Sequence, residues 1–369
     1  MQASFPRCAN RATWCRHVVL VAVCILIYSP TLARPPGPAD AVGLIAKSDL
    51  IVVGRVEDTQ FPEGLPGAAN ESTLFTEDIK VRVDRILMGG SLPSSRVIDI
   101  HLVTFKLLGH GQYGLFFIKT APDGSFSIVD PDNPFLPANP AASKREPLSP
   151  DPLSAVALEL IDVIATPREI LTDPDRGVMF WPSAGPAEEA EMIYATTIEA
   201  LRQVPSNIGR DQLRQAASSG ALLNRLWASS ILLRFDDTST LPQIAPALMT
   251  PAPYTYRAAG AVGSALNSIK YADELPTLVS LLQSDFEPVR AGATAALRGL
   301  HTPESIRPLA QLLQREQDVH VSEQAMWGLC EATHTKSELC GQNIWKGSDP
   351  NIRAAWREWA KTFLANGRE

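Results

Sequence analysis

Polar and apolar residues alternate along the chain between residues 49 and 130, with the period of two that is typical of strands with one solvated face. The alternation is clearest in Lys80 to Arg85 and in Val97 to Val103. Turns rich in glycine and proline separate the alternating segments. Because no helical pattern intervenes, the segments predict a small antiparallel β-barrel. Its strands are expected at 49–60, 75–87, 96–105, 113–120 and 125–130.

Two of these segments carry motifs that resemble a known family. The motif V-x-V-D-R-I-L-x-G occupies Val81 to Gly89, and G-Q-x-x-L-F-F occupies Gly111 to Phe117. Together they resemble the OB-type barrel of the netrin-like and metalloprotease-inhibitor-like domains of exported bacterial proteins, over residues 40–137. Inhibitors of that superfamily chelate the zinc of a protease through an N-terminal cysteine. The expected mature chain has no cysteine near its start, so the resemblance implies the fold and not inhibition.

Beyond residue 187 the apolar residues recur at steps of three and four, which indicates helices. Seven apolar positions between Ala265 and Leu282 recur 31 residues later, between Ala296 and Leu313. The motif V-R-x-x-A-x-A-A-L-x-x-L at Val289 to Leu300 resembles HEAT repeats of the short bacterial kind, over about residues 215–331. Helix pairs of this type cover their apolar stripes only by stacking, so a helical solenoid, an α-α superhelix, is expected over residues 187–369.

The repeat pattern also suggests a binding surface and an end cap. Trp356 and Trp359 lie at helical spacing in 349–366, which predicts a capping helix, with a carbohydrate or peptide platform as the alternative. The second helix of each unit is expected to line the concave face of the solenoid. Polar positions on those helices form the predicted concave binding surface: Thr277, Ser280, Gln283, Arg307, Gln311 and Gln314.

Prolines are concentrated between the two parts of the chain, from Pro122 to Pro186. We therefore expect residues 138–186 to be a proline-rich linker, with one helix around Ala155 to Ile164. Proline permits both a flexible linker and a segment packed against its neighbours, so the sequence leaves this alternative open.

Residues 1–33 are expected to be a cleavable signal peptide. A basic region without acids precedes the apolar run Val18 to Tyr28, and the small residues Thr31 and Ala33 predict cleavage between Ala33 and Arg34. The alternative is an uncleaved anchor, but the run is shorter than the ~20 residues that a spanning helix needs. The chain is therefore expected to be secreted, periplasmic or in the cell envelope, with membrane contact only through this peptide.

Loss of the signal peptide changes the charge and the cysteine content. Three of the 33 basic residues and none of the 40 acidic residues leave with it, so the mature chain carries a net charge of −10. Such a chain is not expected to bind nucleic acid. Cys330 and Cys340 stay as a pair that predicts one disulfide in an oxidising compartment. Zinc binding with His334 would lack a fourth ligand, and free thiols would require that export is wrong.

No catalytic motif of a hydrolase, a zinc protease or a nucleotide-binding enzyme is present in the sequence. His101 and Asp99 share a strand face, but a third ligand or a nucleophile is lacking. We therefore expect a non-enzymatic protein without a cofactor or metal, which binds a protein partner or acts as a scaffold through its repeats. The alternatives are an enzyme or protease inhibitor with its activity in the barrel, and a structural component of the envelope.

Overall fold

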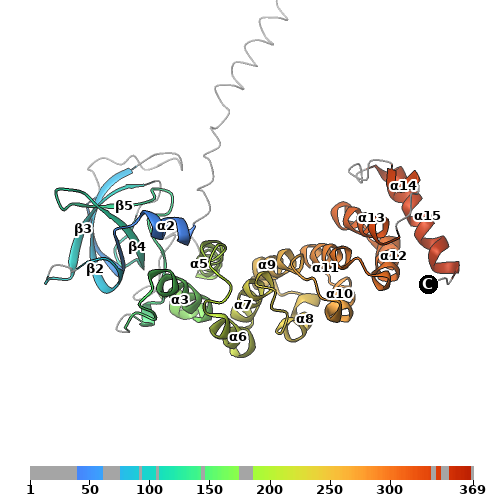
Figure 1. Cartoon of the computed structure of the whole chain (residues 1–369), viewed down its shortest axis with the longest axis horizontal. Helices are drawn as coiled ribbons and strands as arrows, with labels where there is room; N and C mark the ends of the chain where they lie inside the picture. The colour runs from blue at the N-terminus through green and yellow to red at the C-terminus, as the bar shows by residue number, and fades with distance from the viewer. Residues whose placement is uncertain are drawn as a thin grey trace, which may run out of the picture.

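The chain folds into an N-terminal β-barrel followed by a domain of packed helices (Figure 1). The computed structural model describes residues 40–60, 75–90, 94–104, 108–142, 146–173, 186–333, 338–341 and 349–366. The expected signal peptide, with its cut between Ala33 and Arg34, lies outside the described residues.

Five strands form the barrel, at nearly the positions that the alternating pattern predicts. They are β1 (Leu50–Gln60), β2 (Phe75–Met88), β3 (Val97–Thr104), β4 (Tyr113–Thr120) and β5 (Phe126–Ile128). Their order is β1-β2-β3-β5-β4, and β4 pairs back to β1, so the sheet closes on itself. A short strand, β6 (Leu136–Pro137), pairs with β4. A closed ring of five short strands agrees with the expected OB-like class.

The expected purely antiparallel pairing is wrong at one position. β3 and β5 run parallel, with Ile100 opposite Phe126 and His101 opposite Ser127. The reason is topological: β5 forms an antiparallel hairpin with β4 and then lies beside β3 in the same direction. Alternation along a single strand shows which face is buried, but it carries no information about the direction of the neighbouring strand.

The alternation itself follows the two faces of the barrel. On β2 the side chains of Ile79, Val81 and Val83 are buried inside, whereas Asp78 and Lys80 are exposed. Two charged side chains of the same strand, Glu77 and Arg85, are also buried.

The described part of the segment after the barrel contains a packed helix, so that part is not a flexible linker. It contains η1 (Pro140–Ala142), α3 (Pro152–Ala165) and α4 (Arg168–Leu171), while α2 (Ala41–Lys47) precedes the barrel. Asp151 caps the first turn of α3, and the helix buries most of its side chains. Glu159 of α3, fully buried, forms two hydrogen bonds with Arg85 of β2. This helix therefore joins the barrel to the helical domain instead of acting as a free linker.

The helical domain consists of stacked helices joined by short loops, some of which contain a 3-10 turn: η2 (Pro253–Thr255), η3 (Ala272–Glu274) and η4 (Pro303–Ser305). The helices are α5 (Pro186–Ala200), α6 (Arg210–Ser219), α7 (Leu222–Arg234), α8 (Leu241–Met249), α9 (Tyr256–Leu266), α10 (Leu275–Leu281), α11 (Glu287–Leu300), α12 (Ile306–Arg315), α13 (Val319–Thr333), α14 (Glu338–Gly341) and α15 (Pro350–Asn366). The repeated helix pairs expected from the sequence are confirmed, because the leucine and alanine positions of the repeat are mostly buried between these helices.

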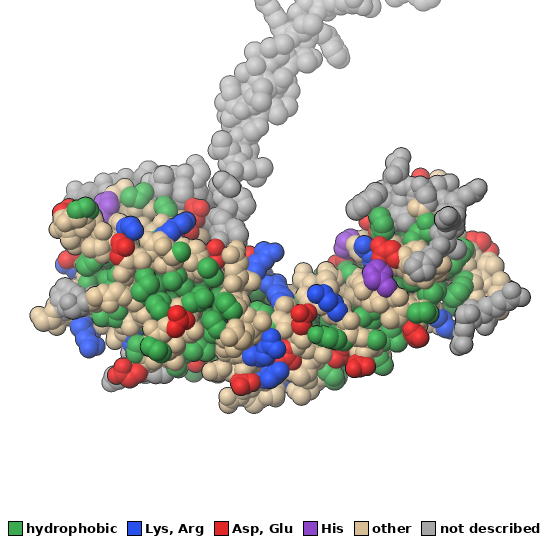
Figure 2. All heavy atoms as spheres, in the orientation of Figure 1, with side chains coloured by type: hydrophobic (Ala, Val, Ile, Leu, Met, Phe, Trp, Pro, Cys, Tyr) green, Lys and Arg blue, Asp and Glu red, His purple; other side chains and the backbone are tan. Residues whose placement is uncertain are grey.

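The helices form two rows along a shallow arc. Figure 1 shows α9, α11 and α13 in one row and α8, α10 and α12 in the other. The barrel and the α14–α15 end both rise on the side of the first row, so that row lies on the inner side of the arc. Figure 2 shows the surface hollowed on the same side.

The C-terminal end is closed by α15, which packs against α12. Trp356 is 1% exposed, and Trp359 lies edge-on to it and stacks on Phe363. The burial of Trp356 agrees with the capping helix that the sequence predicts. A disulfide joins Cys330 of α13 to Cys340 of α14, as the cysteine spacing predicts. Among the described residues, no helix combines the length and the apolar character needed to cross a bilayer.

Candidate functional site

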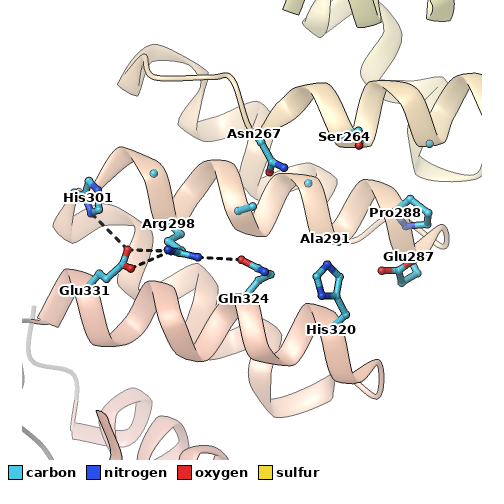
Figure 3. A pocket seen from close by; sticks show the side chains of 15 residues that line it. Ser264, Asn267, Glu287, Pro288, Ala291, Arg298, His301, His320, Gln324 and Glu331 are labelled. Carbon is cyan, nitrogen blue, oxygen red and sulfur yellow. Dashed lines mark hydrogen bonds and ion pairs between the residues drawn. The ribbon is translucent and has the colours of Figure 1, made fainter. Parts of the chain in front are cut away.

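The helical domain has a groove of about 830 Å³ on the inner side of the arc. Residues of three successive first-row helices line it: Gly260 to Asn267 of α9, Glu287 to Gly299 of α11, and His320 to Glu331 of α13 (Figure 3). The volume lies within the ~300–1,000 Å³ that is usual for ligand sites. We call this depression the repeat groove.

Glycines bring α9 and α11 into direct backbone contact beneath the groove. A Cβ atom on Gly292 would lie 1.9 Å from the carbonyl oxygen of Gly263, and one on Gly263 would lie 2.4 Å from that of Pro288. Neither position can therefore carry a side chain without moving a helix. With Ala291 and Ala295 nearby, small residues form the floor, and a ligand backbone can approach the helices closely.

The walls of the repeat groove carry neutral polar groups. Ser264 and Asn267 of α9 are exposed, and Gln324 and His320 face them from α13 (Figure 3). A side-chain amide can both donate and accept a hydrogen bond, which matches the peptide unit of an extended chain. The groove therefore offers hydrogen bonds along its length without requiring a charged ligand.

A charged cluster occupies the end of the repeat groove at the C-terminus of α11. The guanidinium of Arg298 is 3.0 Å from a carboxylate oxygen of Glu331 and 3.3 Å from Oε1 of Gln324. It also lies over the ring of Trp327, 5.2 Å from the centroid. Nδ1 of His301 is 3.9 Å from Glu331. These contacts leave Arg298 already neutralised, so it is not a free anion site.

The six residues predicted for the concave surface do not line the repeat groove. The structure places Thr277 and Ser280 on α10, Gln283 directly after it, and Arg307, Gln311 and Gln314 on α12, all in the other row. Three of their side chains form hydrogen bonds within the chain: Ser280 donates one to the backbone carbonyl of Thr277, Gln283 accepts one from Arg315, and Gln314 donates one to the backbone carbonyl of Arg357. The six residues therefore lie outside the repeat groove and stay a prediction of a binding surface on the other row. Both helices of a repeat have apolar stripes facing each other, so the stripes do not reveal which row lies inside the arc.

The sequence did contain a signal for the row that lines the repeat groove, which is formed by α9, α11 and α13. Glycine in a helix interior costs about 1 kcal/mol relative to alanine. The first-row helices nevertheless carry Gly260 and Gly263 in α9 and Gly292 and Gly299 in α11. Glycines that interrupt a helical pattern indicate close backbone contact, which the structure shows at Gly263 and Gly292, and all four line the groove.

The barrel has a smaller depression, of about 500 Å³, across β2, β3 and β5. His101 is bound there through Nδ1 to Asp78, at 2.8 Å, instead of to Asp99 on its own strand. The register explains the difference, because Asp78 lies directly opposite His101. No cluster of three or more metal-ligating side chains occurs in the described part of the chain. The disulfide removes both thiolates that a zinc site at Cys330 and Cys340 would need, and His334 lies outside the described residues.

A comparison of the chain with protein-family models, with curated proteins and with solved structures finds no match in any of the three.

Proposed function

We propose that this chain is an exported binding or scaffold protein that holds an extended segment of a partner protein in the repeat groove. One observation carries the proposal: three successive helices combine a floor of glycine and alanine with walls of amide and hydroxyl groups. An extended polypeptide has unpaired backbone N–H and C=O groups, and such walls can bind them. A folded helix satisfies its own backbone and would gain little from them.

The packed joint supports a scaffold role. The buried contact between Arg85 and Glu159 fixes the barrel against α3, so the groove is held at a set position relative to the barrel. The disulfide at the end of the arc supports export, since disulfides persist in oxidising compartments.

The test places a photo-crosslinking amino acid at Ser264 or Gln324 in the groove, and at Thr277 or Gln311 in the other row. The same partner should be crosslinked from both groove positions and not from the two control positions. Crosslinking of that partner only from Thr277 and Gln311 would instead support the row predicted from the sequence.

A second measurement uses the purified partner. Replacing Ala291→Trp fills the groove floor, and Ala272→Trp adds the same ring at an exposed alanine in η3 outside the groove. The first change should weaken binding at least tenfold, and the second should leave it within twofold. Equal affinities for both variants would contradict the proposal. Intact mass of the secreted chain checks export, with an N-terminus at Arg34 expected.

A further inference from the structure

At the N-terminus of α11, an aromatic pair lies close in the chain to two residues that line the repeat groove, Gly260 and Glu287. The rings of Tyr256 and Phe286 stack with centroids 4.9 Å apart and an interplanar angle of 15°. Tyr256 is 46% exposed, and it lies on the same helical face as Gly260, which lines the groove. Glu287 follows Phe286 and lines the same end of the groove (Figure 3). We call Tyr256, Phe286 and Glu287 the aromatic end.

The opposite end of the groove shows what such a combination can bind. There, Arg298 lies over Trp327 and pairs with Glu331, so one guanidinium contacts a ring and a carboxylate together. A second contact between a guanidinium and a ring occurs elsewhere in the chain, where Arg168 lies 5.9 Å from the ring centroid of Tyr254.

The aromatic end has the ring and the carboxylate but holds no cation of its own. Within the part of the chain that the structure describes, Glu287 forms no ion pair, and no guanidinium or ammonium group lies over Tyr256. The two nearest arginines in sequence are engaged elsewhere. Arg257 pairs with Glu191 at 3.2 Å, and Arg290 makes two hydrogen bonds to Glu316, at 2.8 and 3.1 Å.

We propose that the aromatic end anchors an arginine or lysine of the bound segment, with the cation at Glu287 and its flat or aliphatic part against Tyr256. This inference rests on the proposed function and specifies the partner: an extended segment with a basic residue. The charges are complementary, because Glu287 forms no ion pair among the described residues and has only a longer-range electrostatic interaction with Arg290, whereas Arg298 is neutralised by Glu331. A cation on an aromatic face is attracted by the ring, and a carboxylate within reach adds to this attraction.

The same geometry argues against anionic ligands. A phosphate or an acidic peptide at this end would meet Glu287 directly, and the described lining offers no unpaired arginine or lysine to compensate. A purely apolar segment would leave the carboxylate and the amide walls without partners, which costs binding energy.

The experiment titrates the full exported chain at low salt with three nine-residue peptides, observed by NMR line broadening of the peptide. Each has blocked ends and alternates glycine with alanine around a central residue, which is arginine, citrulline or glutamate. Citrulline has the shape of arginine without its charge. The arginine peptide should bind at least fivefold more tightly than the citrulline peptide, and the glutamate peptide should not bind.

Matched variants locate the effect. Glu287→Gln and Tyr256→Ala should each weaken binding of the arginine peptide about fivefold, as loss of about 1 kcal/mol implies. Glu304→Gln removes the same charge at an exposed site, and Tyr271→Ala removes an equally exposed ring, both outside the groove. Neither control should change binding by more than twofold, and Tyr256→Phe should retain it.

Two outcomes would overturn the inference. Equal binding of the arginine and citrulline peptides would show that no cation is anchored, and equal effects of Glu287→Gln and Glu304→Gln would place the cation elsewhere. If a partner is still crosslinked from Ser264 and Gln324 in either case, the repeat groove keeps its proposed function and only the anchor fails. If no partner is crosslinked there, the proposed function fails and the inference with it.

Discussion

The barrel and the helical arc are organised by different physical means. The barrel and its joint enclose charged groups: Glu77 is 2% exposed, and the side chains of Arg85 and Glu159 are 3% and 0% exposed. The arc encloses close backbone contacts between glycines, and its ion pairs at Arg290–Glu316 and Arg298–Glu331 keep part of their surface in water. We therefore expect the barrel to respond to changes of charge and the arc to changes of volume.

Ionisation of Glu77 illustrates the first response. Burial raises the pKa of its carboxyl to about 7, although the backbone N–H of Leu108 donates a hydrogen bond that lowers it. In the arc, burial also opposes ionisation of Glu316, but hydrogen bonds from Arg290 and from the backbone hold the pKa of this carboxyl below its ordinary value. Glu77 in the barrel therefore lacks the hydrogen bonds from an arginine that stabilise the ionised form of Glu316 in the arc.

The largest effect is expected at the joint. Glu159→Gln leaves the charge of Arg85 buried without its counter-ion, which should cost about 3–5 kcal/mol in urea denaturation. Glu358→Gln removes a carboxylate from an exposed pair with Lys361 and should cost less than about 0.5 kcal/mol. The double replacement of Arg85 and Glu159 by methionine should recover most of the stability. A loss below about 1 kcal/mol for Glu159→Gln would contradict the importance of this contact.

A single methyl group should test the arc. Gly292→Ala places a Cβ 1.9 Å from the carbonyl oxygen of Gly263 and should cost about 2–3 kcal/mol, because α9 and α11 must move apart. Gly299→Ala in the same helix meets no atom within 4 Å and should gain about 0.5–1 kcal/mol. Thermal unfolding of the two variants measures the difference. Similar stabilities would show that the helices are not held by this contact.

The disulfide should stabilise the end of the arc by about 2 kcal/mol, the order expected for a short loop. Under oxidising conditions, Cys330→Ser should lower the free energy of unfolding by this amount relative to the native chain. After reduction, the variant and the native chain should be equally stable. Two thiols should become accessible to alkylation only after reduction of the native chain, as intact mass would show. Two free thiols in the secreted protein would contradict the bond.

The smallest effect is a pH dependence in the barrel. A carboxyl whose pKa is raised by folding loses stability as pH rises, here between pH 4.5 and about 7, the ordinary value and the raised value. Glu77→Gln removes the charge and should gain on the order of 1–2 kcal/mol over the native chain at pH 8. The gain should vanish below pH 4.5. A difference that does not change with pH would show that folding does not raise the pKa of Glu77.

Local patterns were sufficient for the elements of both regions. Alternation predicted β1 to β5 within about two residues at each end, because one face of each strand is buried. The repeat predicted the helix pairs from α7 to α13 and the cap formed by Trp356. The spacing of Cys330 and Cys340 predicted their bond. Each of these rests on residues that are near one another in the chain.

The arrangement of those elements depended on contacts between distant residues. Only the tertiary structure decided that β3 and β5 run parallel, that Glu159 meets Arg85 and that His101 pairs with Asp78. It also decided that α9, α11 and α13 line the groove and that Gly263 and Gly292 bring α9 and α11 into backbone contact. The sequence determined which face of each element is apolar, because each buried position within an element must itself be apolar. Which apolar face meets which, and which row lies inside the arc, follows from the packing of the whole chain.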